Sequence, residues 1–385
     1  MSGFGIGIGA GYMRSEQSFR HAGISRYSLN LLDALFTHHP DHAYEVFVNT
    51  NFEAPDRWRA IPAVHIRPEV PDKTGGRALF EHFVGAGRAA KAGAKVWFST
   101  SHLCPFSRRI PRVPTVHDII ALKFPELFPP KMARYMRFAL SYACRKADAV
   151  LVNSEATKAD IVATFAVDPD RIRVVPHAAG NRLTRVLPEA VGDDALRALG
   201  IPFPRYLLAI GTVEPRKNLP RLFEALAQLK RNGLLGDLGL VVGGGKGWKD
   251  SPIYDRLAEL EIGDRVHFLG YVDDAGLPKL YARCEAFVFP SLYEGFGAPL
   301  VEAMICGAPI VASRQAALTE VADEAGVFFD PLDPGDMARV LAETLEDRSG
   351  REARVALGLK QAEFYTWPRV AQQTLGVLGD VVRHR

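Results

Sequence analysis

Short apolar segments alternate with longer helical patterns through the second half of the chain, and this alternation limits the possible folds more than any other feature. Strands that alternate with helices are typical of βαβ units, which build a parallel sheet covered by helices on both faces. The predicted strands lie at 206–210, 238–242, 266–269, 286–289 and 310–312. We therefore expect a doubly wound α/β domain in this half of the chain.

The helix predicted after Asn218 illustrates the pattern. Asn218 can cap the helix, and Pro220 fits its first turn. Leu222, Leu226 and Leu229 fall on one face, which would pack on the sheet.

The first half of the chain repeats this scheme. Its predicted strands lie at 4–8, 44–48, 96–98, 114–116, 149–152 and 173–175, and its predicted helices at 24–36, 131–146 and 155–165. A chain of 385 residues is too long for one core, since single cores stop growing at roughly 250–300 residues. Between 177 and 201 the pattern lapses into Gly, Pro and charged residues, as in a linker. We expect Rossmann-like domains at 1–185 and 186–366 that face a cleft, followed by a C-terminal helix at 367–385.

Charge and composition exclude several classes of protein. The formal net charge is only +3, so nothing favours general binding to nucleic acid, and any basic surface must be local. The four cysteines form no C-x-x-C pair and are interpreted as buried thiols in a reducing compartment. No segment approaches the roughly 18–20 apolar residues that a membrane span requires. These features predict a cytoplasmic protein.

The strongest chemical signal follows the strand predicted at 286–289. A Gly-rich loop containing Glu294 leads into a helix that carries Pro299 in its first turn and Glu302 further on. Unpaired amides and the helix dipole favour an anion at such a helix start. The residues expected to contact a diphosphate there are Gly297, Ala298, Leu300 and Val301. The two carboxylates would flank the phosphate, whereas the alternative interpretation is a Gly-Pro turn with two solvated glutamates.

A second loop, 210–218, also joins a strand to a helix and presents Arg216 beside Lys217. A leaving diphosphate develops negative charge, which cations held in a cleft stabilise. Adjacent cations on a surface are more often simply solvated. This loop therefore indicates a phosphate site only in combination with the Glu294 loop.

Two features of the first half are weaker signals. His117 stands at the carboxyl end of a predicted strand, where its imidazole can contact a sugar hydroxyl or polarise an acceptor. A purely structural histidine is the alternative. Gly23 opens a helix, so its backbone could approach a donor phosphate closely.

Glu294 and Glu302 form an E-x7-E signature, and together with Glu214-Pro215-Arg216-Lys217-Asn218 they resemble the group 1 (family 4) retaining glycosyltransferases of the GT-B fold. The resemblance spans nearly the whole chain, including Tyr365-Thr366-Trp367 before a last helix that in such folds crosses back to the first domain. It implies transfer of a hexose from a nucleotide diphosphate sugar to an acceptor hydroxyl, with retention of configuration. The first domain would bind the acceptor and the second the donor.

The resemblance also assigns roles to residues. Glu302 would bind the ribose and Glu294 the transferred sugar, while Arg216 and Lys217 would bind the diphosphate. His117 would lie at the far side of the sugar. The remaining donor contacts would be Gly23 under the diphosphate, Gly211 after the first strand, and Gly270 and Tyr271 near the base.

The mechanism and the donor follow from the resemblance as well. The donor phosphate would itself take the acceptor proton, because no carboxylate is evidently placed as a nucleophile behind the sugar. We expect no cofactor and no essential metal, and we favour GDP-mannose over UDP- and dTDP-sugars. The acceptor would be a glycan or a lipid-linked sugar of a cell-envelope polysaccharide or glycolipid. The chain departs from the common family pattern in having Gly211-Thr212 instead of Gly-Arg, and Ala22-Gly23 instead of Gly-Gly.

Three other motif matches suggest different functions, and each lacks part of its motif or stands in the wrong structural context. The glycines of 5–9 loosely match a dinucleotide fingerprint of an oxidoreductase, but they lie inside a predicted strand. The loop 243–247 resembles a phosphate loop without its final Ser or Thr, and we interpret it as a flexible loop beside the nucleotide. Asp168-Pro169-Asp170 resembles a metal-binding motif but is typical of a turn. A catalytically silent subunit that only binds sugar nucleotides remains the principal alternative.

Cations crowd the segment 105–146, where nine of them stand against two carboxylates. The helix predicted at 131–146 mixes such cations with Tyr135, Met136, Phe138 and Leu140. A helix of this kind can lie in the headgroup layer of an anionic membrane. The alternative is a helix whose apolar face packs on the core and whose cations are solvated. A peripheral position on the inner face of a membrane is therefore one hypothesis.

Overall fold

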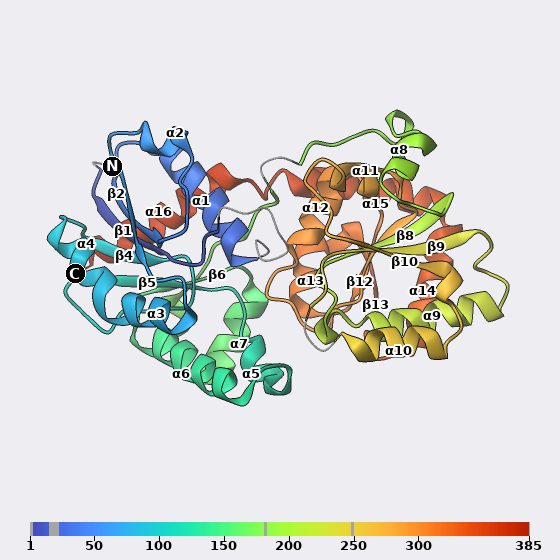
Figure 1. Ribbon diagram of the computed structural model, residues 1–385, viewed down its shortest axis with the longest axis horizontal. Coiled ribbons are helices and arrows are strands. Elements are labelled where there is room, and N and C mark those ends of the chain that lie inside the picture. Colours follow the sequence, from blue (N-terminus) through green and yellow to red (C-terminus); the bar gives the residue numbers. More distant parts are fainter. Residues whose placement is uncertain (1–2, 15–22, 181–182, 248–249, 385) are drawn as a thin grey trace. The chain divides into compact units, whose positions relative to one another are not determined.

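The computed structural model describes residues 3–14, 23–180, 183–247 and 250–384. They form two compact units, drawn in Figure 1: unit 1 comprises Met1–Ala178 and Thr366–Arg385, and unit 2 comprises Ala179–Tyr365. The chain thus passes between units at 178/179 and 365/366, compared with the expected boundaries at 185/186 and 366/367.

Unit 1 contains, among the described residues, a parallel sheet of seven strands in the order β3-β2-β1-β4-β5-β6-β7. The strands are β1 (Gly5–Ala10), β2 (Ala43–Asn49), β3 (Val64–Val70), β4 (Val96–Ser99), β5 (Arg112–Val116), β6 (Val150–Val152) and β7 (Ile172–Val174). The sequence did not reveal β3, because it is an edge strand in which only Val64 and Val70 are buried. It also contains Pro68, which lacks an N–H and is tolerated at a sheet edge.

The helices of unit 1 cover both faces of this sheet. They are α1 (Ile24–His38), α2 (Asp56–Arg59), α3 (Thr74–Leu79), the π-helix η2 (Phe80–Val84), α4 (Gly85–Lys91), α5 (Ile120–Lys123), η3 (Pro125–Leu127), α6 (Pro130–Lys146), α7 (Glu155–Phe165), η4 (Pro169–Arg171) and α16 (Trp367–Arg383). None of the helices described combines the length and the apolar character needed to cross a bilayer.

The C-terminal helix α16 belongs to unit 1, as the sequence predicted. Figure 1 shows it, in red, beside α1, and Val370, Ala371 and Leu378 are buried in the same core as α1. The Trp367 ring meets the Tyr27 ring edge to face at a centroid distance of 5.8 Å. The helix therefore returns to the N-terminal unit and completes its core.

The glycines of β1 are explained by packing. A Cβ on Gly7 would lie 2.3 Å from the Ala89 Cβ, and one on Gly9 would lie 2.2 Å from the Glu81 carboxylate. Glycine thus lets η2 and α4 approach the strand, where Trp97 fills the same face of the sheet. Because these residues lie inside a strand, the dinucleotide fingerprint does not apply.

Unit 2 contains, in its described part, a parallel sheet of six strands in the order β10-β9-β8-β11-β12-β13. The strands are β8 (Arg205–Ile210), β9 (Leu238–Gly243), β10 (Val266–Gly270), β11 (Ala286–Phe289), β12 (Ile310–Ser313) and β13 (Gly326–Phe329). Side chains of β8 alternate between the two faces: Tyr206 and Leu208 enter one apolar core, whereas Leu207 and Ala209 enter the other. This period of two, with both faces buried, is what a doubly covered parallel sheet requires.

The helices of unit 2 lie on both faces of its sheet. They are η5 (Pro188–Ala190), α8 (Asp193–Ala198), η6 (Pro215–Lys217), α9 (Leu219–Arg231), α10 (Ser251–Glu259), η7 (Gly263–Arg265), α11 (Leu277–Arg283), α12 (Ala298–Cys306), α13 (Ala316–Ala322), η8 (Asp323–Ala325), α14 (Pro334–Glu346) and α15 (Arg348–Ala362). On α9, the predicted stripe of Leu222, Leu226 and Leu229 is buried against the sheet.

Two details of the sequence analysis were wrong. Asn218 precedes α9, but its side chain makes no capping hydrogen bond. It adopts a left-handed conformation and instead binds carbonyl groups of two other loops. The stretch 177–201 is also not only linker, because α8 lies in it and Leu196 and Ile201 join the core. A helix this short carries too few apolar residues to display a period.

We predict that Glu81→Gln removes a pH dependence of stability. Glu81 is completely buried, and burial raises the pKa of its carboxyl to about 8, whereas the same group titrates near 4.5 when solvated. The unfolded chain therefore loses this proton first, and the wild type loses stability as the pH rises from about 4.5 to about 8, by roughly 1.4 kcal/mol per pH unit. The variant carries a neutral amide and should gain stability relative to the wild type over this interval, measured by urea unfolding.

The matched control is Glu189→Gln, which changes an exposed carboxyl and should leave the pH profile of the wild type unchanged. If the Glu81→Gln profile runs parallel to that of the wild type, Glu81 does not hold its proton in the folded state.

Candidate active site

Two strand-to-helix loops of unit 2 meet at the carboxyl edge of its sheet, because β8 and β11 are neighbouring strands. The loop after β8 leads through η6 to α9, and the loop after β11 leads to α12. The Leu292 amide donates to the Arg216 carbonyl at 2.9 Å, and the Asn218 side-chain amide donates to the Pro290 carbonyl at 3.1 Å. The two predicted motifs thus form one structural unit.

Four charged side chains form an ion-pair cluster between these loops: Glu214, Arg216, Lys217 and Glu294. Lys217 Nζ donates to Glu294 Oε1 at 2.7 Å, and Arg216 Nη1 lies 2.5 Å from Glu294 Oε2. Arg216 also binds Glu214 Oε1 through Nη2 at 2.7 Å. The Lys217 ammonium lies 4.6 Å from the centre of the Phe289 ring. Two cations and two carboxylates therefore balance one another in a largely buried place.

The electrostatics of the cluster keep Glu294 ionised. Burial alone would raise its pKa, but the nearby Arg216 and Lys217 reverse that effect and hold the pKa at about 2. Burial lowers the pKa of Lys217, while the Glu294 carboxylate opposes the shift. Glu294 is thus an ionised carboxylate held by two cations. Another anion that enters the site can take its place as the partner of these cations.

Two glycines make room for this arrangement. A Cβ on Gly211 would lie 2.9 Å from the Lys217 Cε, and Gly211 has a φ of 148°. Gly297, which precedes α12, has a φ of 95°, and a Cβ there would lie 2.6 Å from the Leu318 side chain. Both positions therefore require glycine for conformation and for space.

The helix α12 begins directly after Gly297, with Pro299 in its first turn and no side-chain cap. Its first residues are the predicted phosphate contacts Ala298, Leu300 and Val301, of which Leu300 donates its amide to the Gly297 carbonyl at 2.9 Å. Glu302 lies further along the helix, is buried, and accepts a hydrogen bond from the Tyr281 hydroxyl at 3.2 Å. The helix start and both predicted carboxylates thus belong to one loop and helix.

The loop 243–247 is held by backbone hydrogen bonds, contrary to the expectation of a flexible loop. Val213 donates its amide to the Gly245 carbonyl at 3.0 Å, and Gly247 donates to the Val213 carbonyl at 3.1 Å. Gly270 has a φ of 72° and accepts from the Gly244 amide at 2.6 Å, while Tyr271 after it is exposed. This bonding ties the ends of β9 and β10 to the loop after β8.

In unit 1, His117 lies at the carboxyl end of β5, as predicted, and both its ring nitrogens are engaged. Its Nε2 donates to the Thr100 carbonyl at 3.0 Å, and its Nδ1 accepts from the Asn153 side-chain amide at 2.8 Å. Burial lowers the pKa of His117, which favours the neutral ring. The ring also meets Tyr27 edge to face at 4.6 Å. To contact a substrate hydroxyl, His117 must exchange one of these partners.

Gly23 precedes α1 with a φ of 68°, and a Cβ there would have no neighbour within 4 Å among the residues that the structure describes. Its carbonyl accepts from the Tyr27 amide at 3.0 Å. Its predicted neighbour Ala22 lies outside the described residues. The structure brings together the predicted residues of unit 2, and His117 and Gly23 belong to unit 1.

Sequence reasoning missed residues that hold the site. Tyr281 positions Glu302, Gln315 donates to the Glu294 carbonyl at 3.3 Å, and Asn153 positions His117. None of them belongs to a motif, and each contacts its partner across a long sequence separation.

Asp168 accepts from the Asp170 amide at 2.9 Å, which supports the turn interpretation of that segment. Among the described residues, no group of three or more His, Cys, Asp or Glu side chains is arranged to hold a metal ion.

Comparison with known families agrees with this organisation. Residues 197–361 match the family of glycosyl transferases group 1, and residues 22–179 match glycosyltransferase family 4. The chain is 34% identical over 265 residues to the O-antigen chain mannosyltransferase B of Escherichia coli, covering 68% of each chain. It is 30% identical over 381 residues to a D-inositol 3-phosphate glycosyltransferase of Salinispora tropica, covering 89% of this chain and 78% of the relative.

Solved structures share the fold. A sucrose-phosphate synthase of Thermosynechococcus elongatus matches with a TM-score of 0.73 and 21% identity, over 99% of this chain and 98% of that chain. The Anabaena protein HepE, solved with UDP and glucose, matches with a TM-score of 0.71 and 20% identity, over 97% and 99%. Because the family matches fall on both units and the relatives cover most of the chain, the protein belongs to the group 1 glycosyltransferases of family 4 and is a glycosyltransferase with two Rossmann-like units.

Proposed function

We propose that this glycosyltransferase moves a hexose, mannose in the first instance, from a nucleoside diphosphate donor to an acceptor hydroxyl with retention of anomeric configuration. The acceptor would be a glycan or a lipid-linked sugar in the assembly of a cell-envelope polysaccharide or glycolipid. We place the reaction in the cytoplasm, which agrees with four free, buried cysteines.

The ion-pair cluster is the observation that carries this proposal. Arg216 and Lys217 are held at the carboxyl edge of the sheet, and the loop that carries their partner Glu294 leads into α12, whose helix dipole also favours a diphosphate. A donor diphosphate would replace the Glu294 carboxylate as the partner of the two cations. Glu294 would then be released to accept hydrogen bonds from the hydroxyls of the transferred sugar.

The proposed mechanism assigns the remaining steps to the donor and the chain. As the bond from the sugar to the diphosphate breaks, Arg216 and Lys217 stabilise the negative charge that develops on the leaving group. The departing phosphate takes the proton of the attacking acceptor hydroxyl on the same face of the sugar, which retains the configuration. Glu302, fixed by Tyr281, would bind the ribose hydroxyls of the nucleotide.

The proposed sugar rests on relatives. Two relatives of this chain are mannosyltransferases: the O-antigen chain mannosyltransferase B and an MMP alpha-(1->4)-mannosyltransferase of Mycolicibacterium hassiacum. The second is 34% identical to this chain over 241 residues. Both names support mannose as the sugar, and the O-antigen relative supports an envelope polysaccharide as the acceptor. HepE, crystallised with UDP-glucose, keeps a UDP-sugar as the alternative donor.

A donor screen followed by a product analysis tests the proposal. GDP-mannose, UDP-glucose and dTDP-glucose are compared by thermal shift, since a donor at 100 times its dissociation constant stabilises the folded chain by roughly 2.7 kcal/mol. The anomeric configuration of the product is then read by NMR. An inverted product would contradict the retaining mechanism, and tight donor binding without turnover on any acceptor would favour the silent binding subunit.

We predict that Lys217→Ala lowers kcat by roughly 100-fold, because a preorganised cation at the leaving group is lost. Arg216 still pairs with Glu294 in this variant, and circular dichroism checks that the protein remains folded. Steady-state kinetics with the donor from the screen provide the measurement. Lys230→Ala, which removes an exposed cation of α9, is the control and should keep wild-type activity. Retention of turnover within a few-fold in Lys217→Ala would remove Lys217 from the mechanism.

A second prediction separates the two carboxylates. Glu302→Gln should weaken binding of the bare nucleoside diphosphate by roughly 10-fold, because an ionised acceptor for the ribose hydroxyls is lost. Glu294→Gln should leave that affinity unchanged or raise it, because the cations no longer have to release a carboxylate, yet it should depress transfer. Calorimetry with the sugar-free nucleotide distinguishes the two, with the exposed Glu324→Gln as control. Equal losses of affinity would contradict the division of roles.

A further inference from the structure

Unit 1 exposes large apolar side chains on α3, η2 and α6. Leu79 ends α3 and is 61% exposed, and Phe83 in η2 is 62% exposed. Phe138 on α6 is 53% exposed. Single exposed apolar residues are ordinary on a protein surface, but a contiguous group of them marks an interaction site.

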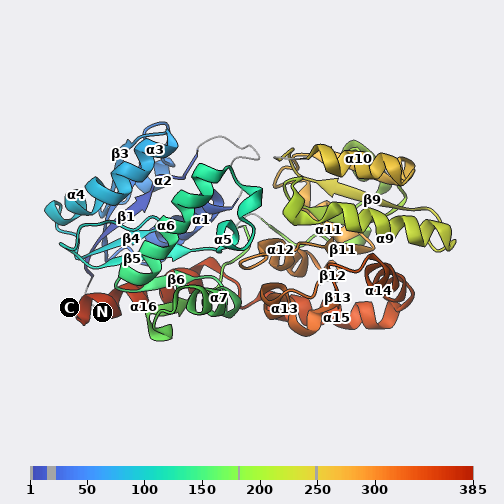
Figure 2. The ribbon, with the colours of Figure 1, turned by 90° about the horizontal axis from the view of Figure 1, so that it is seen from below.

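Ring contacts join these segments into one surface, although they are far apart in the sequence. The Phe83 and Phe106 rings lie 4.9 Å apart, Phe106 and Tyr142 lie 4.7 Å apart, and Phe138 and Tyr142 lie 6.2 Å apart. In Figures 1 and 2, α3 and α6 accordingly lie near each other on unit 1. We call Phe83, Phe106, Phe138 and Tyr142 the aromatic patch, and the exposed Leu79 stands four residues before Phe83.

A basic hollow of about 530 Å³ adjoins the aromatic patch. Its lining contains five cations and one carboxylate: Arg108, Arg112, Arg145, Lys146, Arg171 and Asp148. Tyr142 joins the two features, because its hydroxyl accepts from Arg112 at 3.4 Å while its ring belongs to the patch. The hollow and the patch are therefore parts of one surface.

Two of these cations serve the fold, and the others face outward. Arg112 and Arg171 donate to carbonyl groups at the C-terminal end of α6, namely those of Arg145, Lys146 and Ala147. This anchoring holds the end of the helix, so that the exposed side chains of Arg145 and Lys146 stand at the rim of the hollow. Within the described ranges of the chain, Arg145 and Lys146 form no ion pair with a carboxylate.

The exposed face of α6 continues the positive charge. Lys131, Arg134 and Arg137 are exposed and, among the residues with described positions, none of them forms an ion pair. The structure corrects the sequence analysis of this helix in one respect: Leu140 is buried, and the half-buried Tyr135 donates or accepts a hydrogen bond with His82 at 3.1 Å. Of the four large apolar residues considered there, Phe138 is the one that stands exposed.

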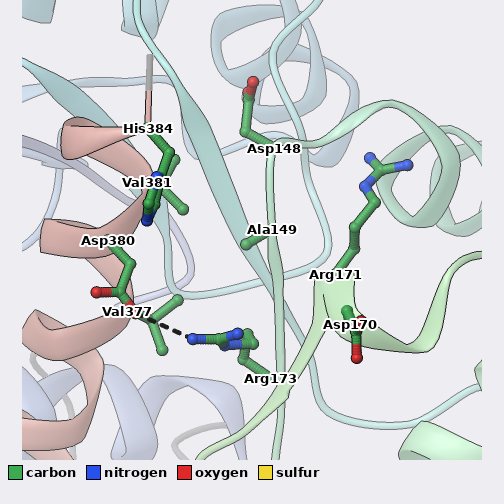
Figure 3. A pocket seen from close by; sticks show the side chains of 9 residues that line it. All are labelled: Asp148, Ala149, Asp170, Arg171, Arg173, Val377, Asp380, Val381 and His384. Carbon is green, nitrogen blue, oxygen red and sulfur yellow. Dashed lines mark hydrogen bonds and ion pairs between the residues drawn. The ribbon is translucent and has the colours of Figure 1, made fainter.

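A second hollow in the same region is lined by side chains of both charges. Figure 3 shows that it lies between the starts of β6 and β7 and the end of α16, where Arg173 pairs with Asp380 at 3.0 Å. Its lining includes Asp148, Asp170 and Asp380 beside its two arginines. That hollow carries no excess of positive charge, unlike the basic hollow at the end of α6.

The basic hollow lies at the amino ends of β5 and β6, since Arg112 begins β5 and Asp148 precedes β6. His117 lies at the opposite, carboxyl end of β5. The basic hollow therefore lies at the other end of β5 from His117, and the aromatic patch, the basic hollow and the exposed face of α6 contain none of the residues to which we assign the reaction.

We propose that this surface docks unit 1 on a bilayer containing anionic phospholipid. The exposed apolar side chains enter the headgroup layer, and the cations of α6 and of the hollow bind lipid phosphates, which is the combination that stabilises a peripheral protein on such a membrane. Charge complementarity selects this occupant. A symmetric contact with a second copy would place the cations against themselves, and nucleic acid offers nothing to exposed aliphatic side chains such as Leu79.

The proposal concerns where the enzyme works, and it stands independently of which donor it uses. Co-sedimentation of the full chain with phosphatidylcholine vesicles, with and without phosphatidylglycerol, tests it. The wild type should bind the anionic vesicles, more weakly as salt rises, and should not bind the neutral ones. Arg145→Ser with Lys146→Ser, and separately Phe83→Ser with Phe138→Ser, should each lower the partition coefficient by on the order of 10-fold or more.

Matched variants in unit 2 provide the controls. Arg348→Ser with Lys360→Ser removes two exposed cations, and Leu332→Ser with Phe364→Ser removes two exposed apolar side chains, and both should bind vesicles like the wild type. Nucleotide binding, measured on every variant, should be unchanged, which separates failure of this proposal from failure of the proposed transferase chemistry. Equal binding to neutral and anionic vesicles, no binding at all, or equal losses in the unit 2 variants would overturn the proposal.

Discussion

A buried glutamate with two cationic partners organises the candidate active site. Glu294 lies in the loop after β11, and Arg216 and Lys217 lie in the loop after β8, so the ion pairs fasten two neighbouring strand ends to each other. A buried carboxylate without such partners would be very costly. Much of the local sequence serves this contact: Gly211 leaves space for Lys217, Phe289 underlies its ammonium, and Asn218 ties the same two loops through their backbone.

The ion-pair cluster also explains how the candidate active site can be stable without donor and still bind a diphosphate. In a folded chain without donor, Glu294 pairs with both cations, so each of the four charges of the cluster has a partner. A diphosphate offers the same cations a denser negative charge, and the start of α12 lies in the adjoining segment to share it. The proposed exchange of partners therefore links donor binding to release of the carboxylate that would hold the sugar.

Much of the fold could be predicted from the sequence, and the reason is physical. Parallel strands buried on both faces read as short apolar runs, and the stripe of Leu222, Leu226 and Leu229 marks a helix face, so both doubly wound units were expected and confirmed, as was the family. Elements without such a pattern escaped: β3 is an exposed edge strand, and α8 is too short to show a period. The pairings within the site also escaped. Sequence placed Glu294 near the sugar and Lys217 near the diphosphate, but the contact between them spans 77 residues and depends on the order of strands in the sheet. The roles of the individual site residues stay predictions.

The most direct test is a crystal structure of the chain with a nucleoside diphosphate bound. The account predicts that the diphosphate lies within hydrogen-bond distance of Lys217 Nζ and of the first amides of α12, and that the Glu294 carboxylate has left at least one of its two cations. A diphosphate that binds at a distance from Lys217, or that binds while both ion pairs of Glu294 stay intact, would contradict the account.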